Sequence, residues 1–459
     1  MNQHDIVDVK AWIDSRQISP WQWMVLVLCF IIIMFDGYDA AVMGFIAPAL
    51  IEDWGISRSE MGPILGAAMF GVALGALVAG PYADRFGRKK ILLISILCFA
   101  VFSVLSTFAR TPLEMAGLRF LTGLGLGAVM PNTVTLVAEY MPERRRSLLI
   151  TVMYSGFNIG SGVGGFIAAG LLPHFGWQSV LFVGGLIPLL LLPLLMWLLP
   201  ESAMFLVVRN VGYEKIANVL QRAGGVFSAN TKFVLKAPII QKNAKVFQLF
   251  SRGYARGTLV LWVTYFMGLF VIYLLNGWLP TIMHNSGFSL QQSAIVAGLF
   301  QLGGTFGGLL VGGMMDKLQA RKVIAGFYLL GMCCLMAQGF GQFGPMVLAA
   351  LVFCSGVCVN GAQTGLQAFS PAFYPTEIRS TGVCWMHGVG RTGAIISSSL
   401  GGVLLGFFPS QNAIFLVLAL PALLAGLSIL VHRAARPAMM IKGIELEDLP
   451  ELSRTMNHH

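Results

Sequence analysis

Long apolar segments constrain this chain more than any other feature of its sequence. Twelve stretches of about 20 or more predominantly apolar residues can be marked off, which is the length that an α-helix needs to cross about 30 Å of hydrocarbon. No soluble domain could bury all of them, because 56% of the 459 residues are hydrophobic and only 11% are charged. The sequence therefore predicts an all-α polytopic membrane protein. We expect transmembrane helices at 22–50, 61–82, 91–109, 113–138, 147–172, 177–199, 257–281, 291–315, 322–341, 344–369, 381–406 and 411–432.

The basic residues are distributed unevenly between these segments. Loops rich in Lys and Arg stay on the cytoplasmic side of a membrane. If the N-terminus is cytoplasmic, 26 of the 30 basic residues fall on that side, and only Arg58 and Arg110 fall outside. We therefore expect a multi-pass protein in the lipid bilayer with both termini in the cytoplasm. The net charge of +10 is then a topology signal and does not indicate a nucleic-acid partner.

The two halves of the chain resemble each other. The segment 80–90 (GPYADRFGRKK) recurs in degraded form at 312–322, and 140–147 recurs at 374–380. Internal repeats of this kind are typical of transporters, whose substrate site lies at the repeat interface near the middle of the membrane. We expect an N-terminal six-helix bundle at 1–199, a cytoplasmic linker at 200–256, a C-terminal six-helix bundle at 257–432 and a cytoplasmic tail at 433–459.

Four fully charged side chains lie well inside the apolar segments, namely Asp36, Asp39, Arg119 and Arg391. Because a charge at the bilayer centre costs at least about 2.5 to 3.5 kcal/mol, residues of this kind usually have a function. Asp36 and Asp39 are three residues apart, so they share one face of the first helix and can share one cavity. In a poorly hydrated site a carboxyl group favours its neutral form, so we expect one of them to carry a proton. The alternative is a hydrogen bond to a neighbouring helix.

The two arginines differ in their surroundings. Arg391 lies among Gly388, Gly390 and Gly393, small residues that let a ligand or a helix come close, and its forked donors suit a carboxylate. We predict that it binds a substrate anion, with an internal ion pair as the alternative. Arg119 lies on a stripe of glycines in the fourth helix. Proton coupling and structural pairing are both open for it, and direct contact with substrate is a third possibility.

Other side chains at similar depth are candidates for the ligand site. An aromatic ligand needs flat apolar partners and a few polar groups, although most aromatic residues of a membrane protein serve packing. The aromatic candidates are Tyr38, Tyr265, Phe266 and Trp385. The polar ones are Gln301, Asn360, Gln363 and His387. His387 precedes Arg391 by four residues and is predicted to face the same cavity, unless it is a satisfied structural histidine.

Two motifs are specific enough to indicate a family. Residues 80–89 read G-x-x-x-D-R-x-G-R-K, and residues 119–127 read R-F-x-x-G-x-x-x-G. They resemble the loop motif and the fourth-helix motif of the major facilitator superfamily. Tyr82 occupies the usually hydrophobic third position of the loop motif, which leaves its polar members in place. The resemblance implies two pseudo-symmetric six-helix bundles.

Further segments narrow the resemblance. They are 36–50, 199–206, 276–281 and 388–395. Over nearly its whole length the chain resembles the aromatic acid:proton symporter family, especially its 4-hydroxybenzoate and protocatechuate carriers. That resemblance implies a protein of the bacterial inner membrane that imports aromatic carboxylates of the 4-hydroxybenzoate, protocatechuate or benzoate type with protons. The family's paired acids correspond to Asp36 and Asp39.

The loop motif itself is predicted to form a cytoplasmic gate made of Asp84, Arg85, Gly87 and Arg88. Asp84 at a helix end can pair with basic groups of the other half when the cytoplasmic side is closed. A simple topology signal explains the basic residues but not the aspartate or the glycine.

The sequence also sets expectations about chemistry. It holds no recognisable set of nucleophile, base and oxyanion donors and no metal-ligand cluster, so we expect no enzyme, no metal and no cofactor apart from the proton as coupling ion. We expect a monomer. Our hypothesis is alternating access, in which Arg391 or Arg119 pairs with Asp39 in the empty carrier and the substrate carboxylate competes for the arginine.

Other functions remain open. A symporter for another organic anion, such as muconate, would use the same residues. A drug:proton antiporter usually has a Gly-Pro-rich fifth helix, whereas 159–165 has glycines without proline. A sugar symporter is indicated faintly by 200–202, but a neutral ligand gives Arg391 no partner. A membrane sensor would bind ligand without counterflow.

Overall fold

The computed structural model describes residues 6–228, 231–235, 246–251, 254–341, 343–374, 378–408 and 411–431. The predicted tail at 433–459, parts of the linker and the second repeat at 375–377 lie outside the described residues. The long helices of the first half are α2 (Pro20–Trp54), α3 (Arg58–Phe86), α4 (Arg88–Leu105), α5 (Pro112–Tyr140) and α6 (Glu143–Leu198). Those of the second half are α9 (Ala255–Asn285), α10 (Leu290–Met315), α11 (Ala320–Phe340), α12 (Pro345–Phe373), α13 (Arg379–Phe407) and α14 (Gln411–Val431). There are also two short 3-10 helices: η1 (Ser106–Phe108) follows α4, and η2 (Val246–Phe250) precedes α9.

The helices confirm the predicted all-α membrane fold. Ten of the described helices are long and apolar enough to cross a membrane. One of them, α6, has 56 residues and consists of two helices that meet at Gly176. Gly176 has a φ of 72°, a conformation that glycine adopts at little steric cost because it has no Cβ atom. The 29-residue α13 is less apolar because it carries His387 and Arg391 among glycines and serines. With α6 taken as two helices and α13 included, the structure has the twelve predicted spans.

Local sequence explains where several helices begin. In α2, α3 and α10 a serine caps the first turn, and a Gln or Glu three residues later returns a side-chain bond to the serine backbone. This reciprocal capping satisfies two of the N–H groups that every helix start leaves without a partner. The caps are Ser19, Ser57 and Ser289. Gly55 caps the C-terminus of α2 in the left-handed conformation, with φ 61°.

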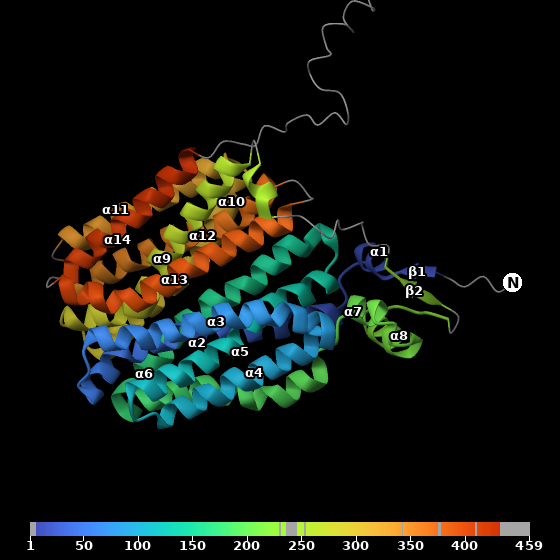
Figure 1. The fold of residues 1–459 in the computed structure, drawn as a ribbon, viewed down its shortest axis with the longest axis horizontal. Coiled ribbons are helices and arrows are strands. Elements are labelled where there is room, and N and C mark those ends of the chain that lie inside the picture. Colours follow the sequence, from blue (N-terminus) through green and yellow to red (C-terminus); the bar gives the residue numbers. More distant parts are fainter. Residues whose placement is uncertain are drawn as a thin grey trace, which may run out of the picture.

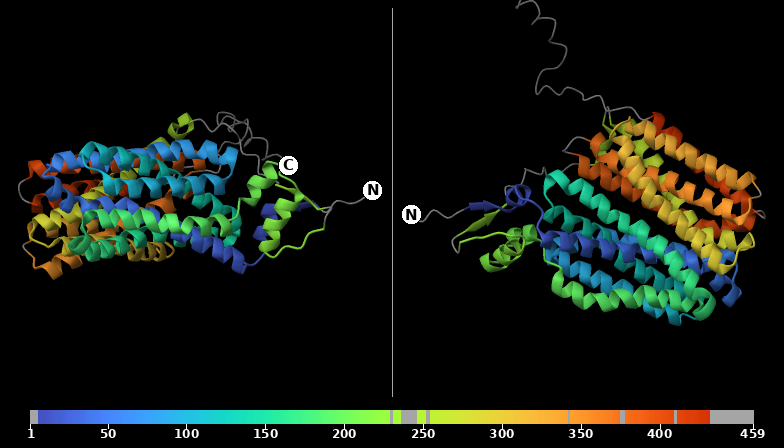
Figure 2. Two further views of the ribbon diagram at one scale, coloured as in Figure 1. Left: turned by 90° about the horizontal axis from the view of Figure 1, so that it is seen from below. Right: turned by 180° about the vertical axis from the view of Figure 1, so that it is seen from behind.

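The helices form two groups that follow the order of the chain (Figure 1), with α2–α6 in one and α9–α14 in the other. Across the interface α2 lies beside α9, α3 beside α13 and α6 beside α10. We call the end of the bundles at which the N-terminal segment lies the linker face, and the opposite end the distal face. In both Figure 1 and Figure 2 the ribbons of the two groups diverge toward the linker face.

Glycines bring the two bundles together on the distal side. A Cβ atom added to Gly44 of α2 would lie 2.2 Å from the carbonyl oxygen of Asn276 on α9. A Cβ on Gly402 of α13 would lie 2.1 Å from the carbonyl oxygen of Arg58 on α3. Such backbone contacts leave no room for a side chain, and they are typical of close helix packing in membranes.

A small unit at the linker face was not foreseen. Strand β1 (Ile6–Asp8) pairs in parallel with β2 (Lys232–Val234), and α1 (Val9–Asp14), α7 (Ala203–Val208) and α8 (Tyr213–Arg222) pack beside them (Figure 2). Trp12 of α1 lies against Phe227, with ring centroids 5.4 Å apart. The Asp14 carboxylate accepts a hydrogen bond from the backbone N–H of Glu143 at 2.8 Å, which links the unit to the first turn of α6.

Candidate functional site

Two of the predicted charged residues form an ion pair inside the first bundle. Asp39 of α2 accepts a bond from Nη1 of Arg119 on α5 at 3.1 Å, and the two residues are 6% and 0% exposed. Ser103 donates to the same carboxylate oxygen at 3.3 Å. The hydroxyls of Ser106 and Thr122 accept from Nη2 of the arginine at 3.2 and 3.0 Å. Of the roles that the sequence left open for Arg119, the structure shows pairing.

The other acid, Asp36, faces the second bundle. It is 6% exposed, and within the described residues its carboxylate accepts no hydrogen bond. Arg391 of α13 lies within electrostatic range of Asp36 and of the Tyr154 and Tyr273 hydroxyls. Nη1 of Arg391 donates to the backbone carbonyl of Val72 on α3 at 3.2 Å, so this side chain spans the interface between the bundles. The structure therefore brings together an acid and an arginine that are more than 300 residues apart.

A chain of polar side chains adjoins Arg391. The Tyr265 hydroxyl of α9 lies 2.8 Å from Nδ1 of His387, which is one turn before Arg391 on α13. Nε2 of Gln367 on α12 donates to the same hydroxyl at 3.2 Å. The Tyr265 ring fits against Gly390, where an added Cβ would lie 2.1 Å from the ring. Tyr265 and His387 therefore lie beside the arginine.

The remaining polar candidates are buried on α10 and α12 of the second bundle. Gln301 donates to Oδ1 of Asn276 at 2.7 Å, and Asn276 donates across the interface to the carbonyl of Ala40 at 3.3 Å. Gln363 accepts from the Tyr328 hydroxyl. The side-chain nitrogens of Gln363 and Asn360 are buried without a hydrogen-bond partner in the described part of the chain.

Three aromatic candidates make no hydrogen bond to the charged groups among the described residues. The Tyr38 hydroxyl donates to the carbonyl of Val180 at 2.8 Å, which holds this ring inside the first bundle. Trp385 stacks on Trp262 with ring centroids 6.1 Å apart and is 45% exposed. The Phe266 ring lies along Phe270. Sequence depth alone could not separate these rings from Tyr265, because the partners of each ring depend on how the helices pack.

The predicted gate segment is anchored to its own bundle. Oε1 of Glu201 accepts from the backbone N–H groups of Arg88 at 2.8 Å and Lys89 at 3.1 Å, at the start of α4. Gly87 has φ 101°, and a Cβ there would lie 2.3 Å from the Glu201 carboxylate. Arg88 also pairs with Glu139 at 3.7 Å. The sequence missed Glu201 as a site residue, although the segment 200–202 could have indicated it.

Other members of the gate segment are placed as follows. The carbonyl of Arg85 accepts from Arg209 at 3.2 Å, so this backbone is tied to the region that follows α7. The side chain of Asp84 lies outside the described part of the structure. Within the described residues, no group of three or more His, Cys, Asp or Glu side chains could hold a metal ion.

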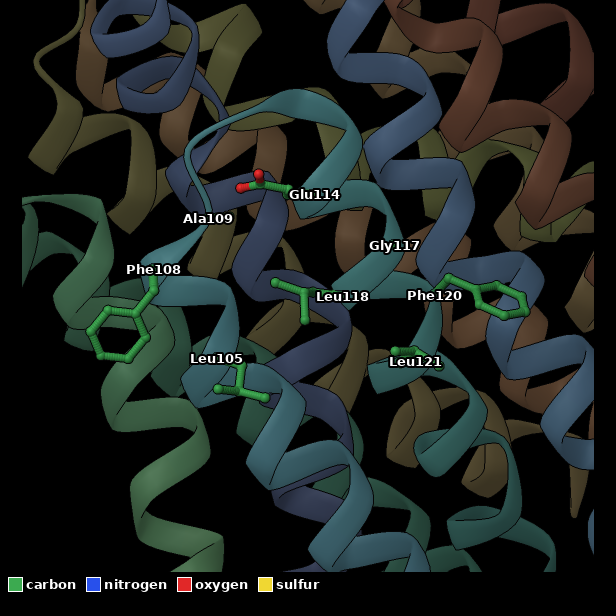
Figure 3. A pocket seen from close by; sticks show the side chains of 8 residues that line it. All are labelled: Leu105, Phe108, Ala109, Glu114, Gly117, Leu118, Phe120 and Leu121. Carbon is green, nitrogen blue, oxygen red and sulfur yellow. The ribbon is translucent and has the colours of Figure 1, made fainter.

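A separate pocket lies beside the distal ends of α4 and α5 (Figure 3). Its lining is almost entirely apolar, and Glu114 is its one charged member. None of the predicted site residues lines it. This pocket is therefore distinct from the cluster around Arg391.

Comparisons with known proteins agree with these features. The family model of the Major Facilitator Superfamily matches residues 28–346 and 261–451. A gallate transporter of Pseudomonas putida is 53% identical over 94% of this chain and 96% of its own length. The 4-hydroxybenzoate transporter PcaK of Pseudomonas aeruginosa is 47% identical over 93% and 95%. A benzoate transport protein of Acinetobacter baylyi is 35% identical over 91% of each chain.

Solved structures show the same fold. The crystal structure of a D-xylose-proton symporter has a TM-score of 0.68 at 16% identity, and the match covers 90% of this chain and 98% of that one. A bacterial homologue of the human lysosomal transporter Spinster, in an inward-facing unoccupied conformation, also has a TM-score of 0.68, at 17% identity over 91% and 99%. This chain therefore belongs to the major facilitator superfamily and, within it, to the family of aromatic acid transporters.

Proposed function

We propose that this chain is a symporter that imports aromatic carboxylates with protons across the bacterial inner membrane. The observation that carries the proposal is the position of Arg391, which reaches from the second bundle to the Val72 carbonyl of the first and has the buried acid Asp36 within electrostatic range. The names of the relatives support the substrate class, since they are transporters of gallate, 4-hydroxybenzoate and benzoate. The coupling ion is the proton, and the working unit is a monomer.

Arg391 is the binding group for the substrate carboxylate. Within the described residues it makes one hydrogen bond, to the carbonyl of Val72, although a guanidinium group has five N–H donors. The remaining donors can hold a carboxylate through two parallel bonds, which is the strongest arrangement for this pair of groups. The hydroxyls of Tyr154 and Tyr273 lie within electrostatic range of the arginine and complete a polar rim.

Charge balance couples the substrate to the proton. An anion held by Arg391 would stand beside Asp36, and two buried negative charges sharing one cation are unfavourable. Binding of a proton to Asp36 removes the second negative charge, so each ligand favours the binding of the other. Asp36 is therefore the proton carrier in this proposal.

Asp39 has a different part in the proposal. Its carboxylate forms an ion pair with Arg119 and accepts a hydrogen bond from Ser103. Its charge is therefore balanced within the first bundle. The pair keeps the first bundle neutral while Asp36 and Arg391 exchange partners. This assigns different tasks to two acids that the sequence could not tell apart.

The geometry of the bundles supports alternating access. Cross-bundle glycine contacts and a hydrogen-bond contact between His284 Nε2 and Glu52 Oε1 (2.7 Å) join the distal sides. The ribbons diverge toward the linker face, which carries the basic loops and is cytoplasmic in our proposal (Figure 1). Alternating access then requires these distal contacts to separate while the linker face closes.

Uptake competition in proteoliposomes tests the proposal. Labelled 4-hydroxybenzoate uptake is measured against excess benzoate, protocatechuate, gallate, muconate or glucose, with and without a protonophore. We expect the aromatic acids to compete, glucose to have no effect, and the protonophore to abolish accumulation. Competition by muconate above that of every aromatic acid would assign another organic anion. Uptake that is insensitive to the protonophore would contradict proton coupling.

A further inference from the structure

His387 combines two properties that the proposed function does not use. It lies one helical turn from Arg391, about 6 Å along α13, and its ring is partly exposed. Its Nδ1 is bonded to Tyr265, whereas its Nε2 has no hydrogen-bond partner among the described residues. A polar nitrogen at the edge of an otherwise satisfied network, close to the carboxylate-binding group, is available to a ligand.

The neighbours of His387 determine which nitrogen carries the hydrogen. The Tyr265 hydroxyl accepts a bond from Nε2 of Gln367 and has a single hydrogen of its own to donate. Within the described residues the one acceptor in reach is Nδ1 of His387 at 2.8 Å. If Nδ1 were the donor, the buried hydroxyl hydrogen of Tyr265 would lose its partner, which is unfavourable. The network therefore runs from Gln367 through Tyr265 to Nδ1.

This direction leaves a neutral imidazole with its hydrogen on Nε2. A neutral ring is also the form that places no second cation beside Arg391. The carboxylate and the para-hydroxyl of a benzoate lie on opposite sides of one benzene ring, a separation of the same order as one helical turn. A ligand whose carboxylate is bound by Arg391 can therefore bring a ring hydroxyl to Nε2.

We propose that His387, oriented by Tyr265 and Gln367, donates a hydrogen bond to a ring hydroxyl of the substrate and so selects hydroxylated aromatic acids over benzoate. His387 is then a binding residue, and Tyr265 and Gln367 are positioning residues. The inference rests on the proposed function, since it requires that aromatic acids are transported. It adds a determinant of which acids are preferred.

The expected change in selectivity follows from the free energy of one hydrogen bond. A net hydrogen bond contributes about 0.5 to 1.5 kcal/mol, which corresponds to a change in preference of roughly two- to tenfold. The measured quantity is the ratio of kcat/KM for 4-hydroxybenzoate to kcat/KM for benzoate in proteoliposomes. This ratio cancels changes in the amount of active protein.

Three variants make the test specific. H387F removes the donor and should lower the ratio roughly two- to tenfold, mainly through KM for 4-hydroxybenzoate. H387Q keeps an N–H donor at nearly the position of Nε2 and should restore part of the ratio. Y265F removes the hydroxyl that fixes the tautomer, and it should lower the ratio less than H387F does. His174→Phe, at an exposed histidine outside the cluster around Arg391, is the matched control and should leave the ratio at the wild-type value.

The outcomes separate the two proposals. If the wild-type protein transports neither acid, the proposed function fails and this inference fails with it. If the wild type transports both acids and H387F lowers both kcat/KM values equally, the histidine acts on the carboxylate or on folding, and the selection role is refuted. Histidine nitrogen NMR gives a second measurement, because the inference requires hydrogen on Nε2 in the wild type and a shift toward mixed tautomers in Y265F.

Discussion

The buried pair of Asp39 and Arg119 allows the most quantitative prediction. Asp39→Asn leaves the arginine charged, because a guanidinium group does not lose its proton inside a protein, and the arginine side chain is 0% exposed. Removing one partner of a buried pair costs about 3 to 5 kcal/mol. The amide oxygen of Asn still accepts one bond, so we expect the low end, about 3 kcal/mol, or roughly a hundredfold in the unfolding equilibrium.

Reversible denaturant unfolding in detergent measures this change. Arg119→Met should be destabilising on its own, whereas the double variant should lose less than the sum, with a coupling energy of about 2 kcal/mol or more. Asp53→Asn is the control, because Asp53 accepts one bond from Trp177 at 2.9 Å and has no cationic partner in the described residues. If Asp39→Asn is no more destabilising than the control, or the coupling energy is near zero, the pair does not hold the first bundle together and our reasoning is wrong.

Three further predictions concern the ends of the bundles. Glu52→Gln removes the charge from the exposed distal contact with His284, so stability should change by less than about 1 kcal/mol while spin-label distances at the distal face lengthen. Gly44→Ala places a Cβ 2.2 Å from the Asn276 carbonyl and should hinder distal closure and slow uptake, whereas Gly117→Ala, with open space around it, should not. Glu201→Gln weakens the cap at the start of α4 and should lower stability by about 1 kcal/mol in thermal unfolding.

Much of the fold could be predicted from the sequence because the bilayer requires long apolar helices. Segment length indicated twelve spans, and the structure extends most of them by a few residues beyond the apolar core. Spacing placed Asp36 and Asp39 on one face of α2, but it could not say which arginine each acid would meet. That choice depends on how α5 packs against α2 and on how α13 packs against α3 and α9, and periodicity within one helix carries no such information.

The same limit explains the other omissions. Tyr154 and Tyr273 look like packing residues along the chain, and their proximity to Arg391 emerges only when α6, α9 and α13 converge. Strand β1 pairs with β2, which lies more than 200 residues further along the chain. Strands of three residues are too short to give a recognisable pattern in the sequence. Glu201 was found in the sequence only as part of a weak motif, because its partners are backbone N–H groups that have no sequence signature.

The central claim is that Asp36 carries the proton that accompanies substrate on Arg391. The most direct measurement compares two activities of Asp36→Asn in proteoliposomes: accumulation of labelled 4-hydroxybenzoate driven by a pH gradient, and exchange of labelled for unlabelled substrate without a gradient. The account predicts that accumulation is lost while exchange continues, since a permanently neutral side chain still permits the anion to bind but no longer moves a proton. Accumulation that survives in Asp36→Asn and responds to the gradient as in the wild type would contradict it.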